Sequence, residues 1–219
     1  MPAPGAAFLF DLDGTLCDSG PGIVLSIRHA MAALGRPLQA GRELNWCVGP
    51  PLSESFAKLL ETTDKDLVQA ALDQYRRRYG SQGVYENELY PGIVDALIAL
   101  GPFAPLYVVT SKPTVFAAEI VRHFGIKGLF QGVFGSGLDG SLGDKGELIA
   151  EVLKSRGLDA GACAMVGDRE HDMAGAAANG VRAVGVLWGY GSEAALRFAG
   201  AQAFVRRPLD LPATLVSPH

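Results

Sequence analysis

The chain has 219 residues, of which 48% are hydrophobic and 19% are charged, and its formal net charge is −4. This length allows one large domain, or one domain that carries a smaller insert, and the apolar content is enough for a sizeable buried core. The charge is mild, and Lys and Arg are scattered, without the basic footprint of a nucleic-acid-binding protein. We therefore expect no nucleic acid polymer among the partners.

Cysteine content and hydropathy bear on the cellular compartment. Cys17, Cys47 and Cys163 lie far apart and show no zinc-binding spacing, which favours a reducing compartment. The first residues lack a basic segment, Asp11 interrupts the next apolar stretch, and no apolar run approaches the ~18 residues of a membrane span. We expect a cytoplasmic protein without membrane association. Cys17, near the candidate site, is either a reactive thiol or an inert small apolar residue.

The first expected elements are one strand and then a helical segment. Residues 6–10 are continuously apolar, as is typical of a strand covered on both faces. From about residue 16 to 88 the apolar spacing predicts amphipathic helices and no strand. The helix faces consist of Ile23, Ile27, Met31 and Leu34, then Leu52, Phe56 and Leu59, and then Val68, Leu72, Tyr75 and Tyr79. We expect residues 17–88 to form a helical insert in a core made of 1–16 and 89–219.

Beyond Tyr90, short apolar runs alternate with helical patterns. Strands are expected at 106–109, 130–134, 162–166 and 182–187, and helices at 116–124, at 148–153 and in an alanine-rich stretch that ends at Gly180. Such alternation implies right-handed crossovers and a mostly parallel sheet. The expected fold class is therefore α/β, with a Rossmann-like, mostly parallel core and an inserted all-helical domain.

Polar residues gather where the expected strands end, which is where parallel α/β sheets bind ligands. They are Asp11 and Asp13 after the first strand, Thr110, Ser111 and Lys112 after the second, Lys145 before the helix at 148, and Asp168 and Asp172 after strand 162–166. Four carboxylates in one crevice would raise each other's pKa values, and a hard cation such as Mg²⁺ relieves this repulsion. Ammonium and hydroxyl groups match phosphate oxygens. The pattern predicts phosphoryl transfer, with an aspartate as covalent nucleophile.

Each part of this pattern, taken singly, also has a non-catalytic explanation. Residues 11–15 would serve as a turn with a helix cap, and residues 110–112 as capping groups before a helix. Asp144 and Glu147 would form a capping box beside a solvated Lys145. Asp168 and Asp172 would complement a helix dipole. The joint occurrence of these groups at strand ends favours the catalytic interpretation.

Together these motifs resemble the haloacid dehalogenase superfamily of phosphatases over essentially the whole chain. Asp11-x-Asp13-Gly14-Thr15 is similar to its first motif, Thr110 or Ser111 to its second, Lys145 to its third and Gly167-Asp168-x-x-x-Asp172 to its fourth. The resemblance implies a nucleophile (Asp11), an acid/base (Asp13) and phosphate ligands (Thr110 or Ser111, and Lys145). It also implies magnesium ligands (Asp11, Asp13 through its carbonyl, and Asp168), with Asp172 either ligating the metal or supporting it through water. It also implies that the insert is a cap. Arg28 and Asn45 are candidate substrate contacts there by position only, and a solvated helix position is the alternative for Arg28.

Within the superfamily, segments at 48–52, 110–113 and 189–192 resemble the branch that contains phosphoglycolate phosphatase and bacterial 5′-nucleotidases. We expect hydrolysis of a small phosphorylated metabolite through an aspartyl phosphate, by a monomer or homodimer. Asp13 argues against a dehalogenase, and the phosphonatase lysine would have to be Lys58 or Lys65, which lie on solvated helix faces. A sugar phosphomutase and a catalytically silent binding module on this fold stay open as alternatives.

Overall fold

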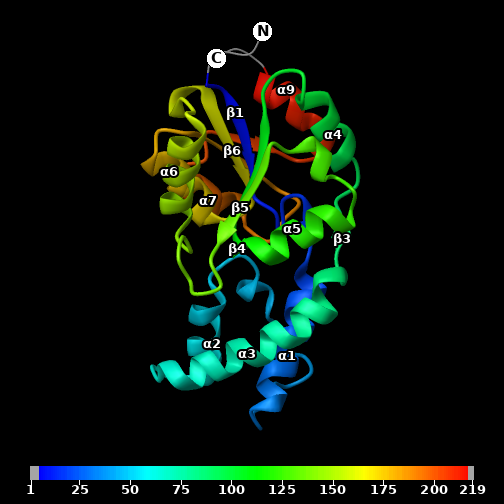
Figure 1. The fold of residues 1–219 in the computed structure, drawn as a ribbon, viewed down its shortest axis with the longest axis vertical. Coiled ribbons are helices and arrows are strands. Elements are labelled where there is room, and N and C mark those ends of the chain that lie inside the picture. The colour runs from blue at the N-terminus through cyan, green and yellow to red at the C-terminus, as the bar shows by residue number, and fades with distance from the viewer. Residues whose placement is uncertain (1–4, 217–219) are drawn as a thin grey trace. The chain divides into compact units, whose positions relative to one another are not determined.

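The computed structural model describes residues 5–216. Residues 1–4, which belong to the first segment without basic residues on which the expected cytoplasmic location partly depends, lie outside this described part. The chain divides into two compact units, one comprising the chain up to Asp18 and from Leu89 onward, and the other Ser19–Glu88 (Figure 1). The expected insert, 17–88, overlaps the second unit, and its interpretation as a cap stays a prediction.

The first unit is built on a six-stranded parallel sheet with the strand order β5-β4-β1-β6-β7-β8. Its strands are β1 (Ala7–Phe10), β4 (Leu106–Pro113), β5 (Gly132–Ser136), β6 (Cys163–Gly167), β7 (Arg182–Val186) and β8 (Ala203–Val205). Its helices are α4 (Ile93–Leu100), α5 (Thr114–His123), α6 (Lys145–Arg156), α7 (Glu170–Ala178), α8 (Glu193–Phe198) and α9 (Leu211–Val216). This architecture confirms the expected α/β class. Because β1 pairs with both β4 and β6, the residues that follow these three strands come together.

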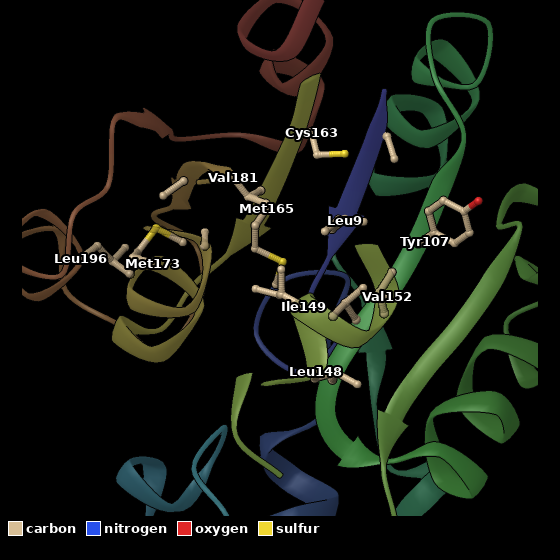
Figure 2. Close-up of a cluster of buried hydrophobic side chains, with 14 residues drawn as sticks. Leu9, Tyr107, Leu148, Ile149, Val152, Cys163, Met165, Met173, Val181 and Leu196 are labelled. Atoms are coloured by element: carbon tan, nitrogen blue, oxygen red, sulfur yellow. The ribbon is translucent and has the colours of Figure 1, made fainter. Parts of the chain in front are cut away.

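Apolar side chains on one face of the sheet pack beneath α6 and α7 (Figure 2). Leu9 of β1, Val109 of β4 and Met165 of β6 are buried there with Ile149 of α6 and Met173 of α7. Burial of each such side chain contributes roughly 1.5–3 kcal/mol. In Figure 1, α4 and α5 lie on the other side of the strands. Helices thus cover both faces, which explains why the strands are continuous apolar runs.

The structure differs from the expected elements in three respects. Strand β4 continues past Val109 to Pro113, because β5 pairs with it across a register shift as far as Ser136. The sequence pattern does not predict α4, α8, α9 or β8, which are too short for a clear apolar period. The segment expected to lack strands has one two-residue strand at each end, where the chain passes between the units: β2 (Cys17–Asp18) and β3 (Glu88–Leu89).

The second unit is helical and has its own aromatic core. Its helices are α1 (Gly20–Ala33), α2 (Leu52–Leu60) and α3 (Lys65–Ser81), with short 3₁₀ turns η1 (Asn45–Cys47) and η2 (Gly83–Tyr85). The Phe56 ring meets Tyr75 edge-on, and Tyr75 stacks on Tyr79. The Asp64 carboxylate caps α3 by accepting backbone N–H groups of its first turn, a contribution of about 1 kcal/mol.

None of the helices found between residues 5 and 216 combines the length and the apolar character needed to cross a membrane.

Candidate active site

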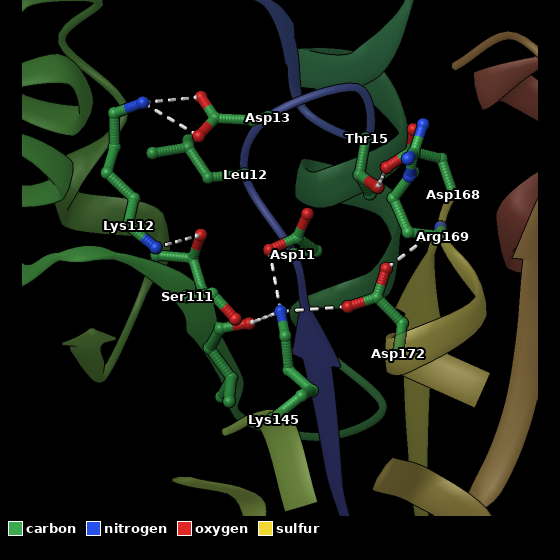
Figure 3. A network of polar contacts seen from close by, with 12 residues as sticks. Asp11, Leu12, Asp13, Thr15, Ser111, Lys112, Lys145, Asp168, Arg169 and Asp172 are labelled. Atoms are coloured by element: carbon green, nitrogen blue, oxygen red, sulfur yellow. Dashed lines mark hydrogen bonds and ion pairs between the residues drawn. The ribbon is translucent and has the colours of Figure 1, made fainter. Parts of the chain in front are cut away.

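Asp11 lies directly after β1, at the centre of the polar network in Figure 3. Its backbone N–H donates to the carbonyl of Val166 at 2.9 Å, so the neighbouring strand β6 holds its position. Its buried carboxylate accepts a hydrogen bond from Lys145 Nζ at 2.8 Å. Burial raises the pKa of Asp11 to about 6, and the Lys145 ammonium opposes this rise. The geometry presents a carboxylate that is already oriented by a cation.

Lys145 is the first residue of α6, and the carboxylate of Asp144 caps this helix. The capping interpretation is therefore correct for Asp144, but Lys145 is buried rather than solvated. Its Nζ lies 2.8 Å from both Asp11 Oδ1 and Asp172 Oδ1, and it donates to the carbonyl of Val109 at 3.0 Å. Burial alone would lower the pKa of Lys145, but the two carboxylates raise it above its ordinary value. Lys145 therefore stays cationic.

Three buried carboxylates form a cluster suited to a cation. Asp11, Asp168 and Asp172 each offer an oxygen, and these oxygens lie within 4.8 Å of one another. When all three carboxylates are ionised, they and the Lys145 ammonium carry a net formal charge of −2. Burial, and then the charges of Asp11 and Asp172, raise the pKa of Asp168 well above its ordinary value. An all-oxygen donor set with this charge fits a hard divalent cation.

The Asp168 carboxylate is held by groups far away in the sequence. Its Oδ1 accepts from Thr15 Oγ1 at 3.2 Å, and its Oδ2 accepts from the backbone N–H of Tyr190 at 2.8 Å. A β-carbon at Gly14, where φ is +84°, would lie 2.2 Å from Asp168 Oδ2, and one at Gly189 would lie 2.4 Å from Asp168 Cβ. Both positions therefore require glycine. The sequence pattern does not predict these supporting roles, although Gly14-Thr15 and the Gly189–Ser192 segment both belong to motifs that it shows.

The carboxylate of Asp13 lies apart from the cluster and is paired with Lys112 (Figure 3). Lys112 Nζ lies 2.8 Å from Asp13 Oδ1 and 2.7 Å from Oδ2, and both residues are buried. A metal-binding role of Asp13 therefore depends on its main-chain carbonyl and stays a prediction. The sequence pattern places Lys112 at this sheet edge but does not identify Asp13 as its partner. One signal was available: Lys112 lies two residues after Thr110 in β4, and residues two apart in a strand point to the same face.

Thr110 and Ser111 lie at the carboxyl end of β4, as expected. Thr110 is buried, and its hydroxyl accepts the backbone N–H of Lys112 at 3.3 Å. Ser111 is half-buried, and its carbonyl accepts a hydrogen bond from Ser136 Oγ at 2.9 Å. Both hydroxyls belong to the strand next to β1, and their role in holding phosphate stays a prediction.

The two candidate substrate contacts lie in the second unit. The Arg28 guanidinium donates to the carbonyls of Gln39, Ala40 and Arg42 at 2.8, 3.1 and 2.7 Å. These hydrogen bonds hold the loop that follows α1, so the Arg28 side chain has a structural role. Asn45 is exposed at the start of η1. Contact of either residue with a substrate stays a prediction.

The chain belongs to the haloacid dehalogenase-like hydrolases, because the family model matches residues 8–186 and so includes every residue from Asp11 to Asp172. It is similar to the 5′-nucleotidase of Pseudomonas aeruginosa, with 46% identity over 192 residues and 86% of each chain covered. It is also similar to the tyrosine-protein kinase PtkA of Mycobacterium tuberculosis, with 41% identity over 84% of this chain and 62% of that protein. A predicted phosphatase from Clostridium acetobutylicum has a similar crystal structure, with 36% identity, a TM-score of 0.92 and coverage of 96% and 98%. These findings confirm the family and an enzyme of the phosphatase type.

Proposed function

We propose that this chain is a magnesium-dependent phosphomonoesterase that forms an aspartyl phosphate on Asp11. The observation that carries the proposal is the Asp11 carboxylate held 2.8 Å from Lys145 Nζ inside a cluster of three buried acids. A phosphate ester would be repelled by a site with a formal charge of −2. A divalent cation together with Lys145 makes the same site attractive to it.

The cation proposed here is Mg²⁺, because the donor set consists of carboxylate oxygens. Asp11, Asp168 and Asp172 would hold it, together with the main-chain carbonyl of Asp13. When bound, Mg²⁺ supplies charge neutralisation for the transferred phosphoryl group.

The chain's own residues then account for both chemical steps. The Asp11 carboxylate attacks phosphorus, the bond from phosphorus to the ester oxygen breaks, and Asp13 gives its proton to that oxygen. Asp13 next takes a proton from a water whose oxygen attacks phosphorus. The bond from phosphorus to Asp11 breaks, which restores the carboxylate and releases inorganic phosphate. Lys145 orients Asp11, and a hydroxyl of Thr110 or Ser111 donates to a phosphate oxygen.

For the substrate we propose a nucleoside 5′-monophosphate first and 2-phosphoglycolate second. The name of the P. aeruginosa relative, at 46% identity, supports the first choice. The second unit would act as the cap that selects the substrate. Cytoplasmic location and a monomeric or homodimeric state stay predictions.

The test is a phosphate-release screen with Mg²⁺ or with EDTA, over nucleoside monophosphates, 2-phosphoglycolate, hexose phosphates and p-nitrophenyl phosphate. We expect Mg²⁺-dependent release, and a loss of more than about 10³-fold in Asp11→Asn. The control is Glu151→Gln, which also replaces a carboxylate by an amide but at an exposed position on α6. Accumulation of an isomeric hexose phosphate would instead indicate a phosphomutase. No turnover on any ester would indicate the silent binding module.

A further inference from the structure

The site contains a second buried cation, Lys112, to which the mechanism above gives no role. We infer that Lys112 is a positioning residue that holds the Asp13 carboxyl group where, once it carries a proton, it can give that proton to the leaving-group oxygen. This inference rests on the proposed function. It concerns how the acid/base is oriented rather than whether the chain hydrolyses phosphate esters.

The contact between the two side chains is built to orient a carboxylate. One ammonium group donates to both oxygens of Asp13, at 2.8 and 2.7 Å, and so restricts rotation of the carboxylate plane. The Lys112 and Asp13 side chains are only 5% and 8% exposed, so water does not compete strongly for the contact. In Figure 3 this pair lies apart from the Asp11–Lys145–Asp172 group, so each carboxylate at the end of β1 has its own cation.

The backbone at Lys112 is itself held in place. Strand β4 shifts register against β5 between Val109 and Pro113, and such irregularities re-aim side chains beside active sites. A β-carbon at Gly135 of β5 would lie 2.3 Å from the Lys112 carbonyl oxygen, so the two strands approach as closely as glycine permits. On either side of Lys112, the Ser111 carbonyl accepts from Ser136, and Thr114 Oγ1 accepts from the Gly135 N–H. An ammonium on so constrained a backbone fits a positioning role.

Stability alone does not explain the pair. A buried ion pair loses so much hydration that well-packed apolar residues often serve as well or better. The two residues are 99 positions apart in the chain, so no local helix or turn requires their contact. Lys145 already supplies the cation at the nucleophile. The contact of Lys112 with both oxygens of Asp13 points to orientation of that side chain.

A change of leaving group distinguishes orientation of the acid from phosphate binding. An alkoxide leaves well only when it receives a proton, whereas p-nitrophenolate leaves without one. The parameter kcat/KM reports the steps up to release of the leaving group. We therefore compare kcat/KM for p-nitrophenyl phosphate with kcat/KM for AMP in the wild-type protein and in Lys112→Met, both with Mg²⁺. The ratio of the two values does not depend on the fraction of folded enzyme, so partial misfolding does not confound it.

We expect the ratio of p-nitrophenyl phosphate to AMP to rise about tenfold or more in Lys112→Met, because general acid catalysis contributes about 10²–10⁴-fold. Lys112→Arg, which keeps the charge, should return the ratio toward its wild-type value. In an Asp13→Asn background, Lys112→Met should add little, since both changes remove the same contribution. Lys154→Met, at an exposed position on α6, should leave the ratio unchanged.

An unchanged ratio would overturn the inference. If kcat/KM falls by the same factor for both substrates, Lys112 acts in phosphate binding or in structure rather than in orienting Asp13. Additive effects of Lys112→Met and Asp13→Asn would overturn it too. If the wild-type protein hydrolyses neither ester, the proposed function fails. If it hydrolyses both and the ratio does not move, only the role of Lys112 fails.

Discussion

Lys145 Nζ lies 2.8 Å from Asp11 Oδ1 and at the same distance from Asp172 Oδ1, so one ammonium joins two buried carboxylates from opposite parts of the chain. In Lys145→Met we expect kcat/KM to fall roughly 10²–10³-fold, as when a preorganised electrostatic contact is lost. The metal-free protein should lose about 3–5 kcal/mol in its free energy of unfolding, because a buried pair is broken. Urea unfolding in EDTA measures this loss, with Lys154→Met as control. If Lys145→Met has the same free energy of unfolding in EDTA as the wild-type protein, the prediction is wrong.

Gly14→Ala should damage the cation site rather than the fold in general. A β-carbon there would lie 2.2 Å from Asp168 Oδ2, and the φ of +84° adds backbone strain of about 1–3 kcal/mol. Gly157→Ala is the matched control, because Gly157 also has positive φ (+62°) but no atom within 4 Å of the added carbon. Both variants should lose stability, and only Gly14→Ala should lose most of the increase in Tm caused by Mg²⁺. Equal Mg²⁺ responses in the two variants would show that Asp168 is not displaced.

Stabilisation by Mg²⁺ should increase with pH. Burial raises the pKa of Asp11 to about 6 and that of Asp168 well above its ordinary value of 3.8. Between about pH 4 and 6 the metal-free native state therefore holds protons that the unfolded chain has released, so these two groups make stability fall as pH rises. A bound cation displaces the protons and removes this loss.

We expect the rise in Tm on addition of Mg²⁺ to be larger at pH 7 than at pH 5, and Mg²⁺ binding at pH 5 to release protons in a weakly buffered titration. Asp168→Asn should reduce both effects. An increase in Tm that is the same at both pH values would contradict the linkage.

The three cysteines should be nearly unreactive in the native protein. Cys17, Cys47 and Cys163 are all buried free thiols. Burial raises the pKa of Cys47 and of Cys163 to about 11, and raises that of Cys17 well above its ordinary value. Of the two alternatives for Cys17, the structure therefore favours the inert one. A thiol-reactive dye should label the native protein slowly at pH 7, faster at higher pH, and completely only in denaturant. Rapid native labelling that Cys17→Ala abolishes would contradict this prediction.

Local patterns were sufficient for the central strands and for the chemical types at the site. Continuous apolar runs indicated the strands near 7–10, 106–109 and 163–166, because strands covered on both faces are apolar at every position. Ligands bind beyond the carboxyl ends of parallel strands, and this rule predicted that Asp11, Lys145 and Asp168 lie at one edge of the sheet. Short peripheral elements such as β8 and α9 were not predicted, because segments of three to six residues are too short to show a hydrophobic period.

Sequence by itself therefore determined the α/β class, the order of the chemical groups along the chain and the edge of the sheet at which they meet. Only the tertiary structure decided which charges pair: Lys145 with Asp11 and Asp172, and Lys112 with Asp13. The physical reason is that burial and pairing depend on distances between residues on different elements, which for Lys112 and Asp13 are 99 positions apart along the chain and for Lys145 and Asp11 are 134. Spacing along one strand or helix does not contain these distances, since they arise when β4, β1 and β6 align side by side.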